Sequence, residues 1–181
     1  MFEKFYDFVG VENKNNVTDM SGFMDIYGGE TFLNGLYRIH NKNDVKKWNE
    51  ILKRAFPKFK NGIQVFGYDW LGRNFALDTQ RDVVLIFEPG TGEILNTEEN
   101  FVNFHDSEIP QYHDACLASE FFTEWFEANG NFVLPHNKCV GYKVPLFLNG
   151  EDDIENLEVS DMEVYWEIMM PFCLLYTSPS P

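Results

Sequence analysis

The sequence predicts an α+β protein built on a central antiparallel sheet. Residues 63–95 hold apolar segments rich in Phe, Val, Ile and Leu, separated by three short clusters of Gly, Pro and Asp at 69–72, 79–82 and 89–92. Gly72 and Gly92 stand where a tight turn needs a positive φ angle. We therefore expect a meander of strands packed by helices, with a smaller and mostly helical C-terminal part.

Helical patterns precede this sheet. Residues 2–9 have apolar side chains at helical spacing before Gly10, which predicts a short amphipathic helix. Residues 11–29 show no sustained period and predict a long connection with at most one helical turn. Residues 36–39 predict a strand. A longer helix is expected between the N-cap Asn43 and Pro57, because one face carries Val45, Trp48, Ile51, Leu52 and Ala55.

Helical patterns also follow the sheet. Residues 98–105 predict a short helix with Thr97 as its N-cap, and residues 112–128 predict one continuous helix that ends at Asn129 and Gly130. The stripe expected to face the core on the second helix consists of Tyr112, Ala115, Cys116, Ser119, Phe122, Trp125 and Phe126.

The C-terminal region predicts two extended segments and a last helix. Residues 139–148 predict an edge strand or a strand with a bulge at Pro145, and residues 154–159 predict a second extended segment after a turn at Asn149 and Gly150. Residues 162–169 predict the helix. Residues 173–181, CLLYTSPSP, resemble the translated read-through of a transposase mosaic-end sequencing adapter. We expect the native chain to continue past Met169 with another sequence.

The net charge of -15 is concentrated in the second half of the chain. Residues 1–95 hold 12 Lys and Arg against 13 Asp and Glu, whereas residues 96–181 hold 2 against 16. Such a field repels nucleic acid and membrane surfaces and attracts basic proteins. The alternative interpretation is that the negative charge serves only to keep the protein soluble. The candidate partner-binding residues are Asp114, Glu120, Glu124, Glu127, Glu151, Asp152, Asp153, Glu155, Glu158, Asp161 and Glu163.

The helix after Asn43 has a basic outer face formed by Lys46, Lys47, Lys53 and Arg54. A nucleic-acid site is disfavoured there because the other half of the molecule is acidic and no aromatic side chains are interleaved. We interpret this face as solvated. Pairing with the acidic half of a second copy is the alternative.

No recognisable catalytic, cofactor or metal motif occurs. The four histidines lack zinc-ligand spacing, and the three cysteines include no C-x-x-C pair. Phosphate-binding loops and nucleophile elbows are absent from the sequence. The chain has no apolar run of roughly 20 residues, and its first residues carry acids within their apolar pattern. We expect a non-catalytic cytoplasmic protein without a cofactor.

Four segments carry a family resemblance: GLYRIHN at 35–41, FGYDWLGRNFALD at 66–78, EPGTGEIL at 88–95 and CVGYKVPLFLNGEDDIENLEVSDMEVYW at 139–166. Together they resemble the type VI secretion DNase-immunity (Tdi) family of bacteria. The resemblance implies a GAD-like domain at 1–96 and an acidic Tdi-type C-terminal domain at 97–171, with residues 172–181 set apart as non-native. It also implies an immunity protein of toxin–antitoxin type that binds and neutralises a cognate basic nuclease.

Two alternatives stay open. The chain could be an orphan small-molecule or regulatory binding module whose acidity serves only solubility. This hypothesis predicts a ligand pocket at the sheet near Tyr68, Trp70 and Arg73. Packing at the tip of a hairpin is the other explanation for the presence of these residues. A hydrolase would use Asp69 or Asp78, of which Asp69 is more simply explained as a turn residue.

Overall fold

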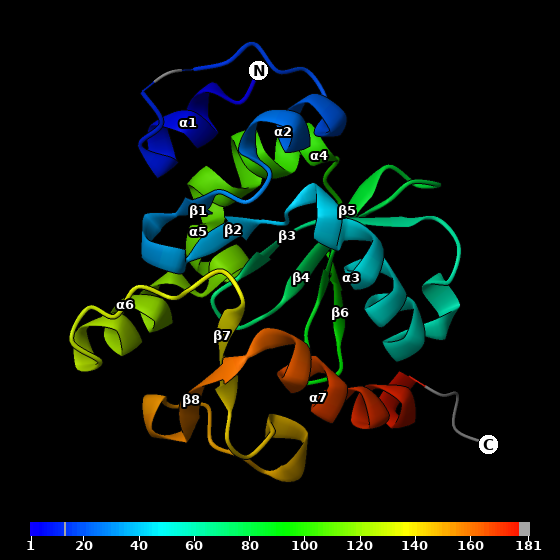
Figure 1. The fold of residues 1–181 in the computed structure, drawn as a ribbon, viewed down its shortest axis with the longest axis vertical. Helices are drawn as coiled ribbons and strands as arrows, with labels where there is room; N and C mark the ends of the chain where they lie inside the picture. The colour runs from blue at the N-terminus through cyan, green and yellow to red at the C-terminus, as the bar shows by residue number, and fades with distance from the viewer. Residues whose placement is uncertain (13, 178–181) are drawn as a thin grey trace.

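A six-stranded antiparallel sheet lies at the centre of the computed structural model, which describes residues 1–12 and 14–177 (Figure 1). Its strands follow one another in space in the same order as in the chain, which confirms the predicted meander and the α+β class. The strands are β1 (Thr31–Phe32), β2 (Tyr37–Ile39), β3 (Ile63–Asp69), β4 (Asn74–Asp78), β5 (Val83–Phe87) and β6 (Ile94–Asn96).

Side chains alternate between the two faces of this sheet. On β5, Val84 and Ile86 face one core, whereas Leu85 and Phe87 face the other. On β3 a register shift between Val65 and Gly67 interrupts the alternation, so that Phe66 faces the first of these cores and Tyr68, two residues later, faces the second. Both faces are therefore buried, which explains why the segments are almost continuously apolar.

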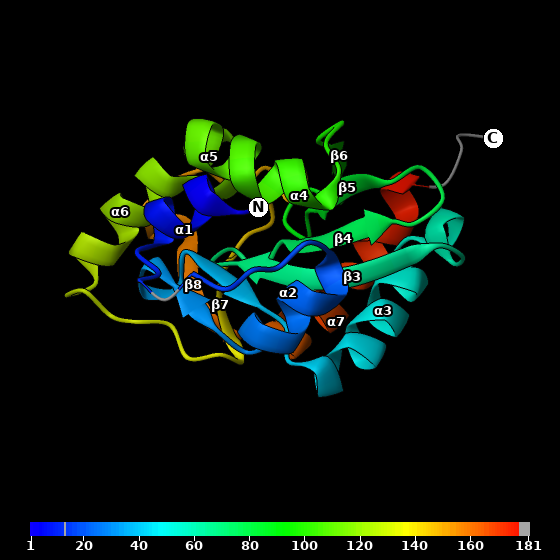
Figure 2. The same ribbon diagram turned by 90° about the horizontal axis from the view of Figure 1, so that it is seen from above.

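Helices cover both faces, so that the sheet forms the middle layer in Figure 2. The first core lies under α1 (Glu3–Val9), α2 (Met20–Tyr27), α4 (Phe101–Asn103) and α5 (Ile109–Leu117). The second core lies under α3 (Lys42–Ala55) and α7 (Met162–Thr177). Because α4, α5 and α7 come from the second half of the chain, both halves contribute to both cores.

The N-terminal helices agree with the sequence in part. The helix expected at 2–9 is present as α1 and ends at Gly10, which has a φ of 75°. The connection at 11–29 contains a complete helix, α2, which begins where Asp19 accepts a hydrogen bond from the Gly22 N–H. The prediction of a single turn was wrong because burial of Phe23, Met24 and Tyr27 stabilises a helix with little sequence periodicity. The N-cap of α3 is Asn41 rather than Asn43.

The expected helices at 98–105 and 112–128 have different boundaries. One helical segment begins after Asn100, passes through a π turn at Phe104–Glu108 and continues as α5. It stops at Ala118, whose φ of 49° separates it from α6 (Ser119–Ala128). The continuous helix was therefore a wrong prediction. Because α5 and α6 follow different axes, one stripe cannot face the core in both, and Tyr112 is 56% exposed.

The acidic region forms a small hairpin and the last helix. Strands β7 (Lys138–Tyr142) and β8 (Leu157–Asp161) pair antiparallel, and the turn expected at Asn149 has a φ of 62°. The extended segment expected at 139–148 ends at Tyr142, because Pro145 leads into a 3₁₀ turn, Leu146–Leu148. Helix α7 begins at Met162, as predicted, but ends at Thr177, beyond the expected last residue Met169. Of the segment set apart as non-native, residues 178–181 lie outside the described residues.

Candidate functional site

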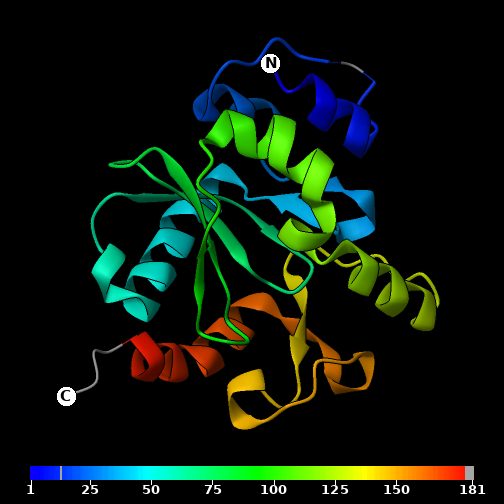
Figure 3. The same cartoon turned by 180° about the vertical axis from the view of Figure 1, so that it is seen from behind.

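The candidate acidic residues lie at the surface. All eleven are exposed except Asp161, which is partly buried. Glu120, Glu124 and Glu127 belong to α6, and Glu151, Asp152, Asp153 and Glu155 belong to the β7–β8 connection. The 3₁₀ turn Ile154–Asn156 of this connection contacts α6, and Figures 1 and 3 show the two side by side. We call these seven residues the acidic surface.

The β7–β8 connection is held in one conformation by its own polar groups. The Asn156 side chain donates hydrogen bonds to the carbonyls of Val144 and Glu151, both at 2.8 Å. Asp153 caps the 3₁₀ turn by accepting from the Asn156 N–H at 3.0 Å. A Cβ atom at Gly150 would overlap the Val144 carbonyl, so only glycine fits there.

The conformation of this connection orients its carboxylates. Tyr142 donates a hydrogen bond to Asp152 at 2.7 Å and thereby ties the acidic connection to β7. A surface hollow of about 340 Å³ opens between its ends, and its acidic lining residues are Glu151, Asp153 and Glu155. The side chains of Glu151 and Glu155 form no hydrogen bond or ion pair with residues that the structure describes. Both carboxylates therefore face solvent without a direct partner, and the nearby Lys143 ammonium group binds the Glu155 backbone carbonyl, at 2.6 Å, rather than a carboxylate.

Two of the remaining acidic candidates, Asp114 and Asp161, have partners within the chain. Asp114 caps α6 through the Glu120 N–H at 2.9 Å. Asp161 caps α7 through the N–H groups of Glu163 and Val164 and lies 3.7 Å from the Lys138 ammonium group. Glu158, on β8, is exposed. All three positions add to the charge of the region, and Asp114 and Asp161 also have structural roles.

The basic face of α3 meets acidic residues of α7 in the same chain. Lys47 and Glu163 form an ion pair at 2.8 Å, and Arg54 and Glu167 form another at 2.5 Å. These contacts cross from the nearly neutral half to the acidic half. Glu163 is consequently less available to a partner than Glu151 and Glu155, whose side chains form no ion pair with the described residues.

Trp70 and Arg73 lie in the interior, at the tip of the β3–β4 hairpin. The Trp70 indole N–H donates to the Leu117 carbonyl at 3.0 Å, and its ring packs against Phe121, Phe122 and Trp125. Arg73 pairs with Asp69 at 2.6 Å and donates to the Cys116 carbonyl at 3.0 Å. The hairpin tip therefore joins the sheet to α5 and α6.

Glu88 completes the buried charge cluster at this hairpin tip. Its carboxylate lies 3.7 Å from the Arg73 guanidinium group, and its side chain is 13% exposed. Burial raises the pKa of Glu88 to about 7, because desolvation disfavours the charged form more than Arg73 stabilises it. No local pattern distinguishes Glu88 from the exposed acids, because the burial of its carboxylate depends on the packing of Tyr142 over the Gly90 turn.

Tyr68 lines a small polar cleft of about 200 Å³ together with His40, Trp48 and His136. Burial lowers the pKa of His40 to about 3, so its imidazole is neutral near pH 7. Arg38 lies beneath, with its guanidinium carbon 4.4 Å from the centre of the Tyr68 ring, and donates to the Pro135 and Lys138 carbonyls. Trp70 and Arg73 do not line this cleft.

Two features are absent from the part of the chain that the structure describes. Within residues 1–12 and 14–177, no group of three or more His, Cys, Asp or Glu side chains has an arrangement that could hold a metal ion. Among the same residues, no helix combines the length and the apolar character needed to cross a membrane.

Sequence reasoning missed the residues that shape the acidic connection, Tyr142 and Asn156. A local pattern was available for one of them, because Asp153 followed three residues later by Asn156 is typical of a capped turn. The tyrosine contact depends on two strands meeting in space and has no local signature.

Comparison with known proteins supports the resemblance to an immunity family over the second half of the chain. Residues 96–172 match the family described as T6SS immunity protein Tdi1, C-terminal. The crystal structure of Atu4351 from Agrobacterium tumefaciens has a similar fold, with a TM-score of 0.66, 14% sequence identity, and coverage of 94% of this chain and 88% of that one. A search of curated proteins finds no match. The family match covers the acidic surface, and the likeness to Atu4351 at this identity concerns the fold alone.

Proposed function

We propose that this protein is a non-catalytic immunity protein that binds and neutralises a cognate nuclease toxin through its acidic surface. The match of residues 96–172 to a T6SS immunity family supports the neutralising role. We choose this surface because the β7–β8 connection exposes carboxylates that have no partner among the described residues. This connection is also the most acidic stretch of the chain.

The physical argument for a nuclease rests on charge. A nuclease presents a positive surface to the phosphates of its substrate, and an acidic protein surface competes for the same field. Complementary fields raise the association rate, and salt screens them over about 10 Å at 0.1 M. A connection already fixed by Asn156 and Tyr142 loses little conformational entropy when it binds.

The test measures association with the nuclease encoded beside this gene. Charge reversal by Glu151→Lys and Glu155→Lys removes no side-chain hydrogen bond or ion pair of the described chain, and we expect it to slow association about tenfold or more at low salt. The matched control is Glu12→Lys with Glu30→Lys, two exposed acids of the other half. Equal association rates for the two double variants would exclude the acidic surface, and the absence of any complex would exclude the immunity role.

The alternative, an orphan binding module, has one supporting observation. The 200 Å³ cleft beside Tyr68 brings the rings of Tyr68 and Trp48 together with the polar groups of His40 and His136, and convergent polar groups beside aromatic rings are one feature of ligand sites. This function predicts saturable binding of a small molecule with perturbation of Tyr68 and His40, in a protein that captures no nuclease. Binding to the nuclease with an unperturbed cleft would reject it.

A further inference from the structure

Among the residues that the structure describes, no strand pairs with the outer edge of β6, the last strand of the sheet. It pairs on one side with β5, where the Glu88 N–H donates to the Glu93 carbonyl at 3.0 Å and the Thr97 N–H donates to the Val84 carbonyl at 3.1 Å. The Glu93 carbonyl and the Thr97 N–H therefore point toward β5, and the backbone groups of Leu95, which lies opposite Ile86, point the same way. Because these directions alternate along a strand, the N–H and C=O groups of Ile94 and Asn96 point away from the sheet.

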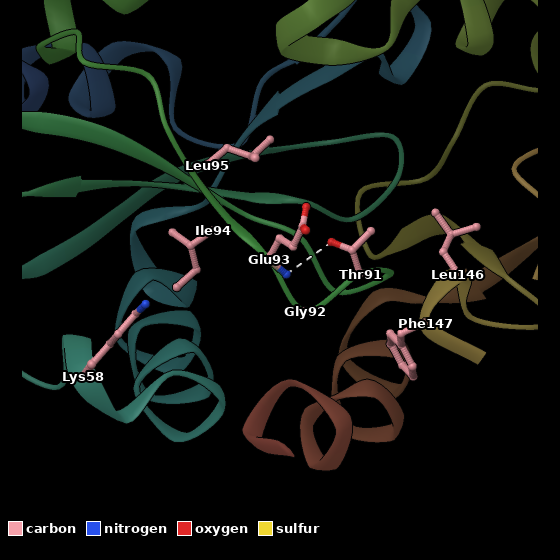
Figure 4. A pocket seen from close by; sticks show the side chains of 8 residues that line it. All are labelled: Lys58, Thr91, Gly92, Glu93, Ile94, Leu95, Leu146 and Phe147. Carbon is pink, nitrogen blue, oxygen red and sulfur yellow. Dashed lines mark hydrogen bonds between the residues drawn. The ribbon is translucent and has the colours of Figure 1, made fainter. Parts of the chain in front are cut away.

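A groove of about 820 Å³ accompanies this edge (Figure 4). Ile94 and Leu95 of β6 lie on one side, and Leu146 and Phe147 of the β7–β8 connection lie on another. Leu95 is 42% exposed, which is unusual for a leucine in a strand of this sheet. The groove thus combines an unpaired strand edge with apolar side chains, the two elements that recognise an extended peptide.

The charged residues that line the groove do not favour a partner of either sign. Its charged lining residues are Lys58 and Glu93, which balance each other. Recognition there would come from backbone hydrogen bonds and apolar contacts. The position of the groove is informative, however, because Leu146 and Phe147 precede the acidic residues of the same β7–β8 connection. The groove and the acidic surface are therefore continuous along one segment of the chain.

We propose that an extended segment of the toxin adds to the sheet beside β6 and places apolar side chains, at every second position, into the groove. This inference rests on the proposed function and deepens it. The acidic surface would accelerate the encounter, and strand addition would fix the orientation of the bound toxin. The partner segment is a strand with alternating apolar residues, because only one face of an added strand can meet Leu146 and Phe147.

The test is residue-resolved amide hydrogen exchange on the full chain, alone and with a catalytically inactive form of the neighbouring nuclease. We expect exchange at the Ile94 and Asn96 amides to slow about tenfold or more in the complex. The amides of Leu95 and Thr97 are the internal controls, since they already face β5. A complex without added protection at Ile94 and Asn96 would overturn strand addition and leave the immunity role intact.

A pair of variants gives a second readout. Asn96→Pro removes one outward N–H donor at an edge position where proline is tolerated, and Asn96→Ala keeps that donor while losing the same side chain. We expect the proline variant to bind the nuclease about tenfold more weakly than the alanine variant. Equal affinities would contradict the inference. Concentration-dependent protection without the nuclease would identify a second copy as the occupant, and failure of any complex to form would remove both proposals.

Discussion

The side chain of Asn156 pairs with both backbone groups of Val144: its Nδ2 donates to the Val144 carbonyl at 2.8 Å, and its Oδ1 accepts from the Val144 N–H at 3.0 Å. A side-chain amide thus replaces a strand partner just beyond the β7–β8 pairing. The acidic connection that follows Val144 is closed into a loop by this contact, which fixes where its carboxylates stand.

Asn156→Ala should loosen this loop. Loss of hydrogen bonds at a half-exposed site is expected to lower the free energy of unfolding by about 1 kcal/mol and to raise amide exchange across 149–156. Exchange measured by NMR checks the expectation, with Glu151→Ala as the control in the same loop, because the exposed Glu151 side chain forms no hydrogen bond or ion pair with the residues that the structure describes. Unchanged exchange in the Asn156 variant would mean that the loop is held by other contacts.

Arg73→Met should destabilise the protein strongly. It leaves the Asp69 carboxylate buried beside Glu88 without its cation, and breaking a buried pair costs about 3–5 kcal/mol. Arg81→Met is the matched control, because Arg81 pairs with Asp78 at 2.7 Å but is 53% exposed. Its expected cost is about 1 kcal/mol or less. Urea unfolding of both variants tests the contrast, and equal costs would contradict the burial argument.

The raised pKa of Glu88 has a defined effect on stability. The folded state holds a proton on Glu88 up to about pH 7, whereas the unfolded chain releases it near its ordinary pKa of 4.5. The contribution of Glu88 to stability is therefore fully present below pH 4.5 and is lost as the pH rises toward 7.

Glu88→Gln should remove this contribution. The difference in unfolding free energy between wild type and variant is expected to shift by on the order of 2 kcal/mol between pH 4.5 and 7.5, in favour of the wild type at the acidic end. Denaturant unfolding across this range measures the shift. Parallel pH profiles for the two proteins would show that Glu88 titrates normally.

Ala118→Gly should stabilise the protein. Ala118 has φ 49° and ψ 50°, a left-handed conformation that costs an L residue about 1 kcal/mol and glycine much less. The control is Ala115→Gly, within α5, which should destabilise by about 1 kcal/mol. Thermal unfolding distinguishes the two signs. Destabilisation by both substitutions would show that packing of the Ala118 methyl group outweighs its backbone strain.

Local patterns predicted the elements that local chemistry controls. Gly72, Gly92 and Asn149 have positive φ angles in the turns where the sequence placed them. The meander followed from these turns, because short connections between apolar segments leave antiparallel neighbours as the natural pairing. The charge asymmetry was likewise a property of the sequence that needed no structure.

The wrong predictions concern places where packing overrides periodicity. Helix α2 forms in a segment with little pattern because Phe23 and Tyr27 are buried against α1. The break at Ala118 has no glycine or proline to announce it, and it lies beside a long-range contact, the hydrogen bond from the Trp70 indole to the Leu117 carbonyl. Such contacts join residues far apart in the chain, so no window of sequence contains them.

By itself, the sequence determined the sheet, its turns, most helices and the concentration of negative charge after residue 96. Only the tertiary structure decided which charged groups are available at the surface. It buried Glu88 and Asp69 with Arg73, paired Glu163 with Lys47, and left Glu151 and Glu155 facing solvent. The physical reason is that a carboxylate's role depends on its distance to cations and water, which folding sets and composition does not.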